Sequence, residues 1–316
     1  MKLVRAGVLG WCMGVRRAVE LAYTEAATSA VSGVQVYTAG PLIHNPQVLE
    51  ELRLRGVQAL DETKLPGDLR GSTVIIRAHG ITPQTEEELI RRGAVIKDAT
   101  CPKVKANQMK ARSLYRAGYR LFLAGEKRHG EVIGIQGYAP DCIIVADREE
   151  AEEAAAALAR KFATAASGED APAALPPKTA VIAQTTLSPE EYRAIGEGIT
   201  RYLPGTEIIN TICPATRDRQ DSLKSLCAGV DAVIIAGSRD SANTRRLLAI
   251  AEACGRQAWL VENARALPPE AAACPVIGLS AGASTPDEVI NSIEAALRAL
   301  SGPKMVPGTM PINIYP

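Results

Sequence analysis

The chain has 316 residues, of which 47% are hydrophobic, and its 36 Lys and Arg residues nearly balance its 35 Asp and Glu residues. This length exceeds the roughly 250 residues at which single hydrophobic cores tend to divide, so two or three compact units are expected. A net charge of +1 provides no overall basic field, which argues against nucleic acid or an anionic membrane as a partner.

Apolar runs and cysteine spacing indicate the location of the protein and the kind of metal site it can form. The N-terminal segment has only a short apolar run, interrupted by Arg5, and no later segment reaches ~18 apolar residues. We therefore expect no signal peptide, no membrane span and a cytoplasmic location, where a disulfide framework is disfavoured. The sequence contains no C-x-x-C pair, so any metal site must be assembled from distant parts of the chain.

Short aliphatic runs alternate with helical patterns along the chain. We predict strands over residues 74–78, 121–124, 180–183 and 232–236, and helices over 46–56 and 188–203. The pairs Ser188-Pro189 and Thr285-Pro286 each combine an N-cap residue with a proline suited to the first helical position. This alternation predicts an α/β fold with mainly parallel strands, which bind ligands at their carboxyl ends.

One pattern occurs three times. A strand, a cysteine and a helix follow one another around Cys12, Cys101 and Cys213, with a proline after the second and third cysteines. A later strand ends in Ala-Gly, and a polar residue follows that glycine after four positions in each repeat, at His44, His129 and Ser241. A third strand in each repeat leads to a polar loop, and these loops contain His79, then Thr185 and Thr186, then Ser284.

The repeat predicts three similar α/β units around a pseudo-threefold axis, with the three cysteines meeting at the centre. The first unit is expected to span residues 13–100, the second 101–209, and the third 210–301 together with 1–12. Residues 163–178 are rich in Ala, Ser, Gly and Pro and predict a loose surface insertion. Residues 302–316, with four prolines, predict an extended tail.

Three converging cysteines suit an iron–sulfur cluster in which one iron has no protein ligand, because full ligation takes four. Helix N-termini beside Cys12, Cys101 and Cys213 would favour their thiolate forms. A zinc site of three cysteines and one histidine remains an alternative, since sulfur ligands suit both centres. The other cysteines fit no repeat position and are interpreted as buried small hydrophobic residues; they are Cys142, Cys227, Cys254 and Cys274.

All three histidines of the chain, His44, His79 and His129, fall in the predicted strand-end loops. Short polar side chains accompany them in these loops, namely Asn45, Ser241, Asn243 and Ser284. Imidazoles, hydroxyls, amides and helix N-termini together suit an enclosed phosphate or diphosphate. Glu131 is the one carboxylate at its level of the repeat and is a candidate proton donor, because burial would raise its pKa.

The sequence resembles the 4-hydroxy-3-methylbut-2-enyl diphosphate reductase family, an iron–sulfur family of the methylerythritol phosphate route to isoprenoids. The resemblance covers nearly all of residues 3–300 in order, and its motifs are Leu9-Gly-Trp-Cys-Met-Gly-Val-Arg-Arg-Ala, Ile43-His-Asn, Ala78-His-Gly, Asp98-Ala-Thr-Cys-Pro, His129-x-Glu-Val, Gln184-Thr-Thr-Leu-Ser, Ile212-Cys, Ala215-Thr, Arg219-Gln, Ser241-x-Asn and Ala281-Gly-Ala-Ser-x-Pro-Asp. Such an ordered set is highly specific.

The resemblance implies a reductive dehydroxylation that yields isopentenyl and dimethylallyl diphosphates. It implies a 4Fe-4S cluster on Cys12, Cys101 and Cys213, with the substrate hydroxyl bound at the open iron and electrons arriving singly from a carrier such as ferredoxin or flavodoxin. It implies catalytic roles for His129, Glu131 and Thr185, with Glu131 and Thr185 in proton delivery. The implied substrate-binding residues are His44, His79, His129, Thr185, Ser241, Asn243 and Ser284.

Two positions depart from the family pattern. Gly130 stands where many members have proline, and Ala242 stands where many have serine. The first is expected to loosen the loop that carries Glu131, and the second removes one possible phosphate donor. Two other functions stay open: another three-domain cluster enzyme such as quinolinate synthase, and a non-catalytic iron–sulfur or zinc sensor.

Overall fold

The computed structural model of this chain describes residues 1–166 and 178–300, which contain three parallel β-sheets of four strands each. The first sheet has the order β3 (Val57–Leu60), β2 (Val36–Ala39), β4 (Thr73–Ile76) and β5 (Val95–Asp98). The second has the order β7 (Ile143–Val145), β6 (Arg120–Ala124), β8 (Thr179–Ala183) and β9 (Glu207–Ile208). The α/β fold with three similar units is confirmed.

The third sheet is completed by the N-terminus of the chain. It has the order β11 (Gln257–Val261), β10 (Ala232–Ala236), β12 (Val276–Ala281) and β1 (Lys2–Arg5). Lys2 pairs with Val276 and Arg5 with Leu279, so β1 takes the edge position that β5 and β9 take in the other sheets. All three sheets therefore share one strand order, and in the third sheet the N-terminal strand β1 supplies the last edge position.

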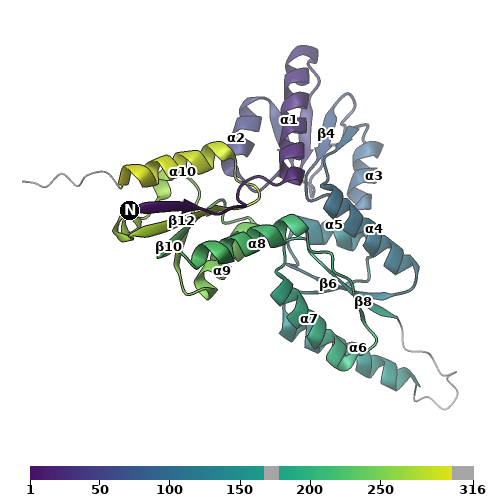
Figure 1. Ribbon diagram of the computed structural model, residues 1–316. Helices are drawn as coiled ribbons and strands as arrows, with labels where there is room; N and C mark the ends of the chain where they lie inside the picture. The colour runs from purple at the N-terminus through teal and green to yellow at the C-terminus, as the bar shows by residue number, and fades with distance from the viewer. Residues whose placement is uncertain (167–177, 301–316) are drawn as a thin grey trace, which may run out of the picture.

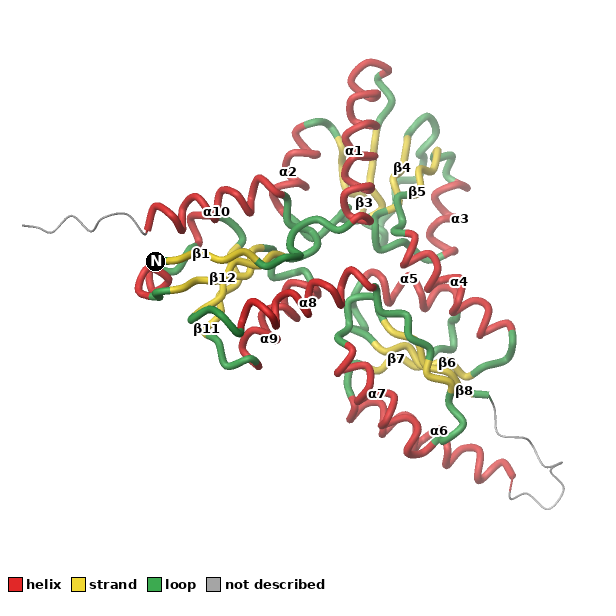
Figure 2. Tube along the Cα trace, viewed as in Figure 1, coloured by secondary structure: helices red, strands yellow, loops and turns green. Residues whose placement is uncertain are grey.

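Helices pack around each sheet and give the molecule three lobes (Figure 1). Near the first sheet are α1 (Met13–Ser32), α2 (Pro46–Leu54) and α3 (Pro83–Arg91); near the second are α4 (Pro102–Arg116), α5 (Gly130–Tyr138), α6 (Arg148–Ala166) and α7 (Pro189–Tyr202); near the third are α8 (Pro214–Cys227), α9 (Ala242–Ala253), α10 (Asp287–Leu300) and the short 3₁₀ helices η1 (Ala264–Ala266) and η2 (Pro269–Ala273). Figure 2 shows the strands inside each lobe and the helices outside them.

The inner strands are mostly buried, because helices cover both faces of each sheet. Every residue of β4, β8 and β10 is buried. Continuous aliphatic runs such as residues 232–236 are typical of parallel strands covered on both sides. The rigid sheets thus hold the loops at their carboxyl ends in fixed positions.

Each of the three repeated cysteines lies in the connection between two units. Cys12 follows β1 of the third sheet and precedes α1, which contacts α2 and β2 of the first unit. Cys101 lies in the same way between β5 and α4, and Cys213 lies between β9 and α8. Because each cysteine leaves one sheet and starts the first helix of the next unit, all three lie toward the centre of the molecule.

Several sequence-based boundaries differ from the structure. The strand predicted over 74–78 ends at Ile76, and the helix predicted to start at Pro286 starts at Asp287. Helix α6 continues to Ala166, so the insertion predicted from residue 163 begins with helix, while 167–177 and the predicted tail 302–316 lie outside the described residues. The proposed unit boundaries stay a prediction. No helix in the described part of the chain is long and apolar enough to cross a membrane.

Candidate active site

A central cavity lies where the three units meet, at the carboxyl ends of their strands. Every metal ligand, substrate-binding residue and catalytic residue that the family resemblance implies lines this cavity; these are Cys12, Cys101, Cys213, His44, His79, His129, Ser241, Asn243, Ser284, Glu131 and Thr185. The residues come from all three units, so the cavity depends on how the units pack.

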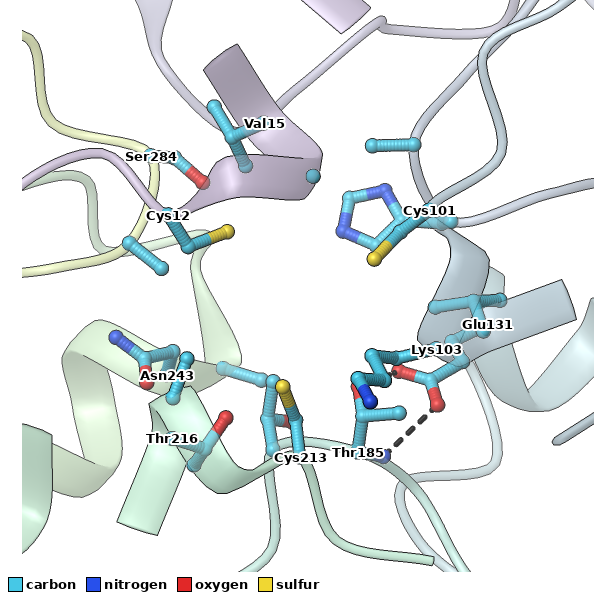
Figure 3. Close-up of a pocket in the computed structure, with 18 of the residues that line it drawn as sticks. Cys12, Val15, Cys101, Lys103, Glu131, Thr185, Cys213, Thr216, Asn243 and Ser284 are labelled. Atoms are coloured by element: carbon cyan, nitrogen blue, oxygen red, sulfur yellow. Dashed lines mark hydrogen bonds between the residues drawn. The ribbon is translucent and has the colours of Figure 1, made fainter. Parts of the chain in front are cut away.

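The three cysteines are the N-cap residues of α1, α4 and α8, as their sequence pattern predicts. None of them uses its sulfur to cap its helix, and all three are free thiols with partial exposure. Figure 3 shows the three sulfur atoms directed into one open space. The N-terminal partial charges of three helices therefore surround a space that suits anionic sulfur.

Gly14 allows the closest approach between two of these cysteine segments. A Cβ atom added at Gly14 would lie 2.5 Å from Sγ of Cys101 and 2.9 Å from its Cβ. Neither atom can move far, because Cys101 is the N-cap of α4 and the next residue, Pro102, starts that helix. The glycine is therefore required by contact between α1 and the Cys101 loop.

Burial raises the pKa of the Cys101 thiol, although the backbone N–H groups of Lys103 and Val104 oppose this shift. The neighbouring Cys12 and Cys213 also raise the pKa, because like charges disfavour one another. Three thiolates without a cation between them would therefore repel. This donor set fits a positively charged metal centre better than it fits three free thiolates.

The remaining cysteines lie away from the cavity. Cys142 and Cys227 are buried, as expected, and burial raises the pKa of each thiol to about 11. The expectation is wrong for Cys254, which is exposed at the end of α9, and Cys274 is only partly buried. Helix ends in this unit face solvent, so a cysteine there is not covered by the core.

The three histidine rings form a compact cluster in the cavity wall. The ring centroids of His44 and His79 are 4.8 Å apart, those of His79 and His129 are 5.1 Å apart, and those of His44 and His129 are 5.9 Å apart. Nδ1 of His129, the N-cap of α5, accepts a hydrogen bond from the backbone N–H of Glu131. Its proton must therefore sit on Nε2, which remains available as a donor.

All three imidazoles are held in the neutral state. Burial, together with the charges of His44 and nearby arginines, lowers the pKa of His129 to about 3. Burial also lowers the pKa of His44, and it holds the pKa of His79 well below the usual value with help from the other two histidines. One nitrogen atom from each ring lies within 4.8 Å of those of the others, so the cluster could also hold a metal ion.

Short polar side chains from the third unit complete the cavity. Ser241 is the N-cap of α9 and accepts from the N–H of Thr244, which leaves its own hydroxyl proton free. Asn243 is buried, and neither atom of its amide group has a partner among the described residues. A buried amide without partners indicates a ligand that is polar, because such groups are otherwise satisfied.

Asn45, one of the polar side chains expected in the cavity, caps a helix instead. Asn45 is the N-cap of α2, and its Oδ1 accepts from the backbone N–H of Val48 at 3.0 Å. It does not line the cavity, because its side chain turns back onto its own helix. Ala242, the position where many family members carry serine, does line the cavity and is buried.

Glu131 is almost fully buried and is held by one residue of the β8 loop. The backbone N–H of Thr185 donates to Oε1 of Glu131 at 2.8 Å, and the Thr185 hydroxyl donates to Oε2 at 2.7 Å (Figure 3). Burial raises the pKa of the carboxyl group, and the hydrogen bonds from Thr185 oppose this shift. The pair is thus a carboxyl group whose pKa is raised and a hydroxyl bonded to it, and both residues line the cavity.

The cavity also contains residues to which the sequence analysis assigns no role. Thr216 and Arg219 lie three and six residues after Cys213 in α8, on the face that lines the cavity. Their helical spacing from the cysteine was a usable signal, because residues three or four apart share a helix face. Lys103, which follows Cys101 by two residues, also lines the cavity (Figure 3).

Comparison with known proteins gives consistent matches over most of the chain. The family model described as LytB protein matches residues 3–298. The chain is 41% identical over 300 residues to the 4-hydroxy-3-methylbut-2-enyl diphosphate reductase of Treponema denticola, which covers 94% of this chain and 99% of that protein.

Two solved structures are similar to this one. The E-1-hydroxy-2-methyl-but-2-enyl-4-diphosphate reductase from Plasmodium falciparum has a TM-score of 0.80 and 27% identity, over 93% of this chain and 87% of that chain. An (E)-4-hydroxy-3-methyl-but-2-enyl diphosphate reductase, described as the terminal enzyme of the non-mevalonate pathway, has a TM-score of 0.63 and 37% identity, over 95% of this chain and 100% of that chain.

Proposed function

The chain belongs to the LytB protein family, and we propose on this basis that it reduces 4-hydroxy-3-methylbut-2-enyl diphosphate to isopentenyl and dimethylallyl diphosphates. The reaction removes one allylic hydroxyl as water and consumes two electrons and two protons. The main support is one cavity whose walls combine three free cysteines, three neutral histidines and a buried carboxyl group. A single-electron carrier such as ferredoxin or flavodoxin is the proposed partner.

Cys12, Cys101 and Cys213 are the proposed ligands of a 4Fe-4S cluster. Their sulfurs face one space, none is committed to a disulfide or a helix cap, and three thiolates there need a cationic centre. When bound, such a cluster supplies single electrons and, at the iron without a protein ligand, a Lewis-acid position. The chain itself contributes three helix N-termini that favour the ionised sulfur atoms.

The histidine cluster and the polar side chains of the third unit are proposed to bind the diphosphate. Nε2–H of His129, the hydroxyls of Ser241 and Ser284, and the unpartnered amide of Asn243 are donors in the same cavity. Neutral imidazoles donate to phosphate oxygens while keeping their other nitrogen as an acceptor. Bound diphosphate would raise the pKa of these histidines, so binding and proton uptake are expected to be coupled.

Glu131 and Thr185 are proposed to deliver the proton that leaves with the hydroxyl. A carboxyl group whose pKa is raised by burial keeps its proton closer to neutral pH than an exposed Glu does. The Thr185 hydroxyl is hydrogen-bonded to Glu131, so its oxygen can accept the carboxyl proton while its own proton passes to the departing hydroxyl in the cavity. His129, whose Nδ1 accepts a hydrogen bond from the backbone N–H of Glu131, is the proposed orienting partner.

The three histidines also support a different candidate, a metal ion bound by three imidazoles, because their nitrogens lie close enough together. A diphosphate accounts for more of the cavity, since Asn243 and the two serines belong to the same wall. Metal analysis separates the two candidates. An iron–sulfur enzyme contains iron and sulfide, whereas a histidine-bound zinc ion would be retained by a triple Cys12, Cys101 and Cys213 to Ser variant.

The function is tested by anaerobic turnover of the allylic diphosphate with a chemical reductant, which removes the natural electron donor from the assay. Asn243→Ala and Ser284→Ala should each weaken substrate binding by about 1–3 kcal/mol, because a charged partner loses a hydrogen bond. Ser280→Ala is the matched control, since Ser280 is buried in β12, the strand that precedes the Ser284 loop, and does not line the cavity. Equal binding of the diphosphate and its unphosphorylated alcohol would contradict the proposed pocket.

A further inference from the structure

Arg219 is a buried guanidinium in the cavity wall, and only 2% of its surface is exposed. One terminal nitrogen donates to the backbone carbonyl of Gly10 at 2.7 Å, and the other donates to the carbonyl of Ala215 at 3.1 Å. Gly10 lies two residues before Cys12, and Ala215 lies two residues after Cys213. One side chain therefore connects the loop of one cysteine to the helix of another.

The positive charge of Arg219 has no ion-pair partner of its own. In the described part of the chain its guanidinium forms hydrogen bonds to carbonyls only, and its Nε is buried without a partner. Burial lowers the pKa of this group. Negative charge on Cys12 and Cys213 raises the pKa, and each of these two cysteines has a larger effect than the exposed Asp218. An unpaired buried cation is costly, so the negative charge that balances it must lie in the cavity.

The other two units place uncharged residues at the same offset from their cysteines. Six residues after Cys101 is Asn107, whose amide donates to the carbonyl of Ala183 at 2.8 Å, and six residues after Cys12 is Ala18. A hydrogen bond from this helix position to the backbone carbonyl of a distant segment therefore occurs in two of the units, but only Arg219 adds a charge. The asymmetry shows that Arg219 is not required by the repeated fold alone.

We propose that Arg219 is a positioning and charge-balancing residue for the three-cysteine centre, an inference that rests on the proposed iron–sulfur function. Its hydrogen bond to Gly10 holds the Cys12 loop against the Cys213 helix, and its bond to Ala215 within α8 fixes the direction of the guanidinium. Its fixed charge favours the more negative, reduced state of the centre. Reduction potentials of iron–sulfur clusters depend on nearby charge, hydrogen bonding and solvent access. Arg219 is thereby a determinant of how easily the enzyme accepts electrons.

Three variants separate the charge from the hydrogen bonds. Arg219→Met removes both, Arg219→Lys keeps the charge but loses the planar fork that reaches two carbonyls, and Arg217→Met is the control, because Arg217 is exposed on the same helix. The readouts are the midpoint potential of the anaerobically purified holoenzyme, followed by spectroscopy, and the rate of iron loss to a chelator. Neither readout depends on turnover.

In Arg219→Met the ratio of reduced to oxidised cluster at a fixed ambient potential should fall at least about tenfold, a shift of about 59 mV for one electron. Iron loss to the chelator should be faster by about tenfold. Arg219→Lys should keep the wild-type potential but lose iron faster than wild type, and Arg217→Met should match wild type in both measurements.

The inference is overturned if Arg219→Met keeps the wild-type potential. If this variant does not fold or loads no cluster, Arg219→Lys decides instead, and wild-type iron retention in that variant would remove the positioning role. A wild-type chain that contains no iron and sulfide would overturn the proposed function and the inference together. A cluster-bearing Arg219→Met enzyme with unchanged potential overturns the inference alone.

Discussion

Glu131 shows at the scale of single residues how burial determines the chemistry of a carboxyl group. The side chain is 1% exposed, and both of its oxygens accept hydrogen bonds from Thr185. Burial penalises the ionised form and hydrogen bonds favour it, and the pKa is raised because burial has the larger effect. The result is a rigid acid whose direction is set by a neighbouring loop.

Replacing Glu131 with Gln should slow C–O bond cleavage by about 10²–10⁴-fold, the usual contribution of general acid catalysis. Glutamine keeps the shape but supplies no acidic proton, so the cluster and diphosphate binding should persist. The measurement is anaerobic single-turnover kinetics with chemically reduced enzyme, with Glu149→Gln on the exposed start of α6 as the control. Cleavage at a near wild-type rate would assign proton delivery to Thr185 or to the diphosphate of the substrate.

The cysteines divide into two groups at the same scale. Serine at Cys12, Cys101 or Cys213 should remove most of the iron, because the alcohol does not replace the thiolate as a ligand. Serine at Cys142, which is buried outside the cavity, should leave the iron-to-protein ratio near wild type. Iron and sulfide analysis of anaerobically purified variants makes the comparison, and the reverse pattern would refute the assignment of the ligands.

At the scale of elements, helix N-termini position most of the site. Cys12, Cys101, Cys213, His129 and Ser241 are all N-cap residues. An N-cap residue has extended backbone, so its side chain projects beyond the end of its helix. Parallel sheets place these helix starts at the carboxyl edges of the strands, and this shared geometry brings residues from five helices into one cavity.

The loop that carries Thr185 depends on the capping box of α7. The Ser188 hydroxyl accepts from the N–H of Glu191, and the Glu191 carboxylate accepts from the N–H of Ser188. Ser188→Ala should cost about 1 kcal/mol locally and speed hydrogen exchange of the amides in the first turn of α7 about fivefold. Ser225→Ala in the exposed part of α8 is the control. Unchanged exchange in α7 would show that the rest of the box holds the loop.

At the scale of the whole molecule, contacts between units set the dimensions of the cavity. Arg246 of α9 pairs with Glu126, which follows β6, at 3.2 Å and with Glu191 of α7 at 3.0 Å. The arginine is 12% exposed, whereas the two carboxylates are 36% and 46% exposed. These ion pairs connect the third unit to the second beside the loop that carries Thr185.

Arg246→Met should lower the free energy of unfolding by about 1 kcal/mol, because solvent screens the partly exposed carboxylates and limits the loss. Urea unfolding measures the change. Arg298→Met is the control, since Arg298 pairs only within α10 and is 64% exposed, and it should have a smaller effect. Equal shifts in the two variants would mean that the pairing between units adds no stability.

The repeated order of strand, cysteine and helix was readable from the sequence because it is local. Hydrophobic runs predict strands, cap residues predict helix starts, and a pattern that occurs three times predicts three similar units. The same reasoning selected the cavity residues on those repeats, including the three histidines. The sequence predicts the ends of elements less accurately, as at Ile76 and Asp287, because the terminal residues of a strand or helix depend on packing as much as on the sequence pattern.

Local sequence patterns predict the α/β class, the threefold repeat, the place of residues 1–12 in the third unit and many of the residues that line the cavity. The packing of the units, by contrast, turns Asn45 onto its own helix and brings Arg219 to Gly10. It also lowers the pKa values of the three histidines. The physical reason is that element type follows from neighbouring residues, whereas burial, unpaired charge and contacts across about 200 positions arise only when the three units pack together.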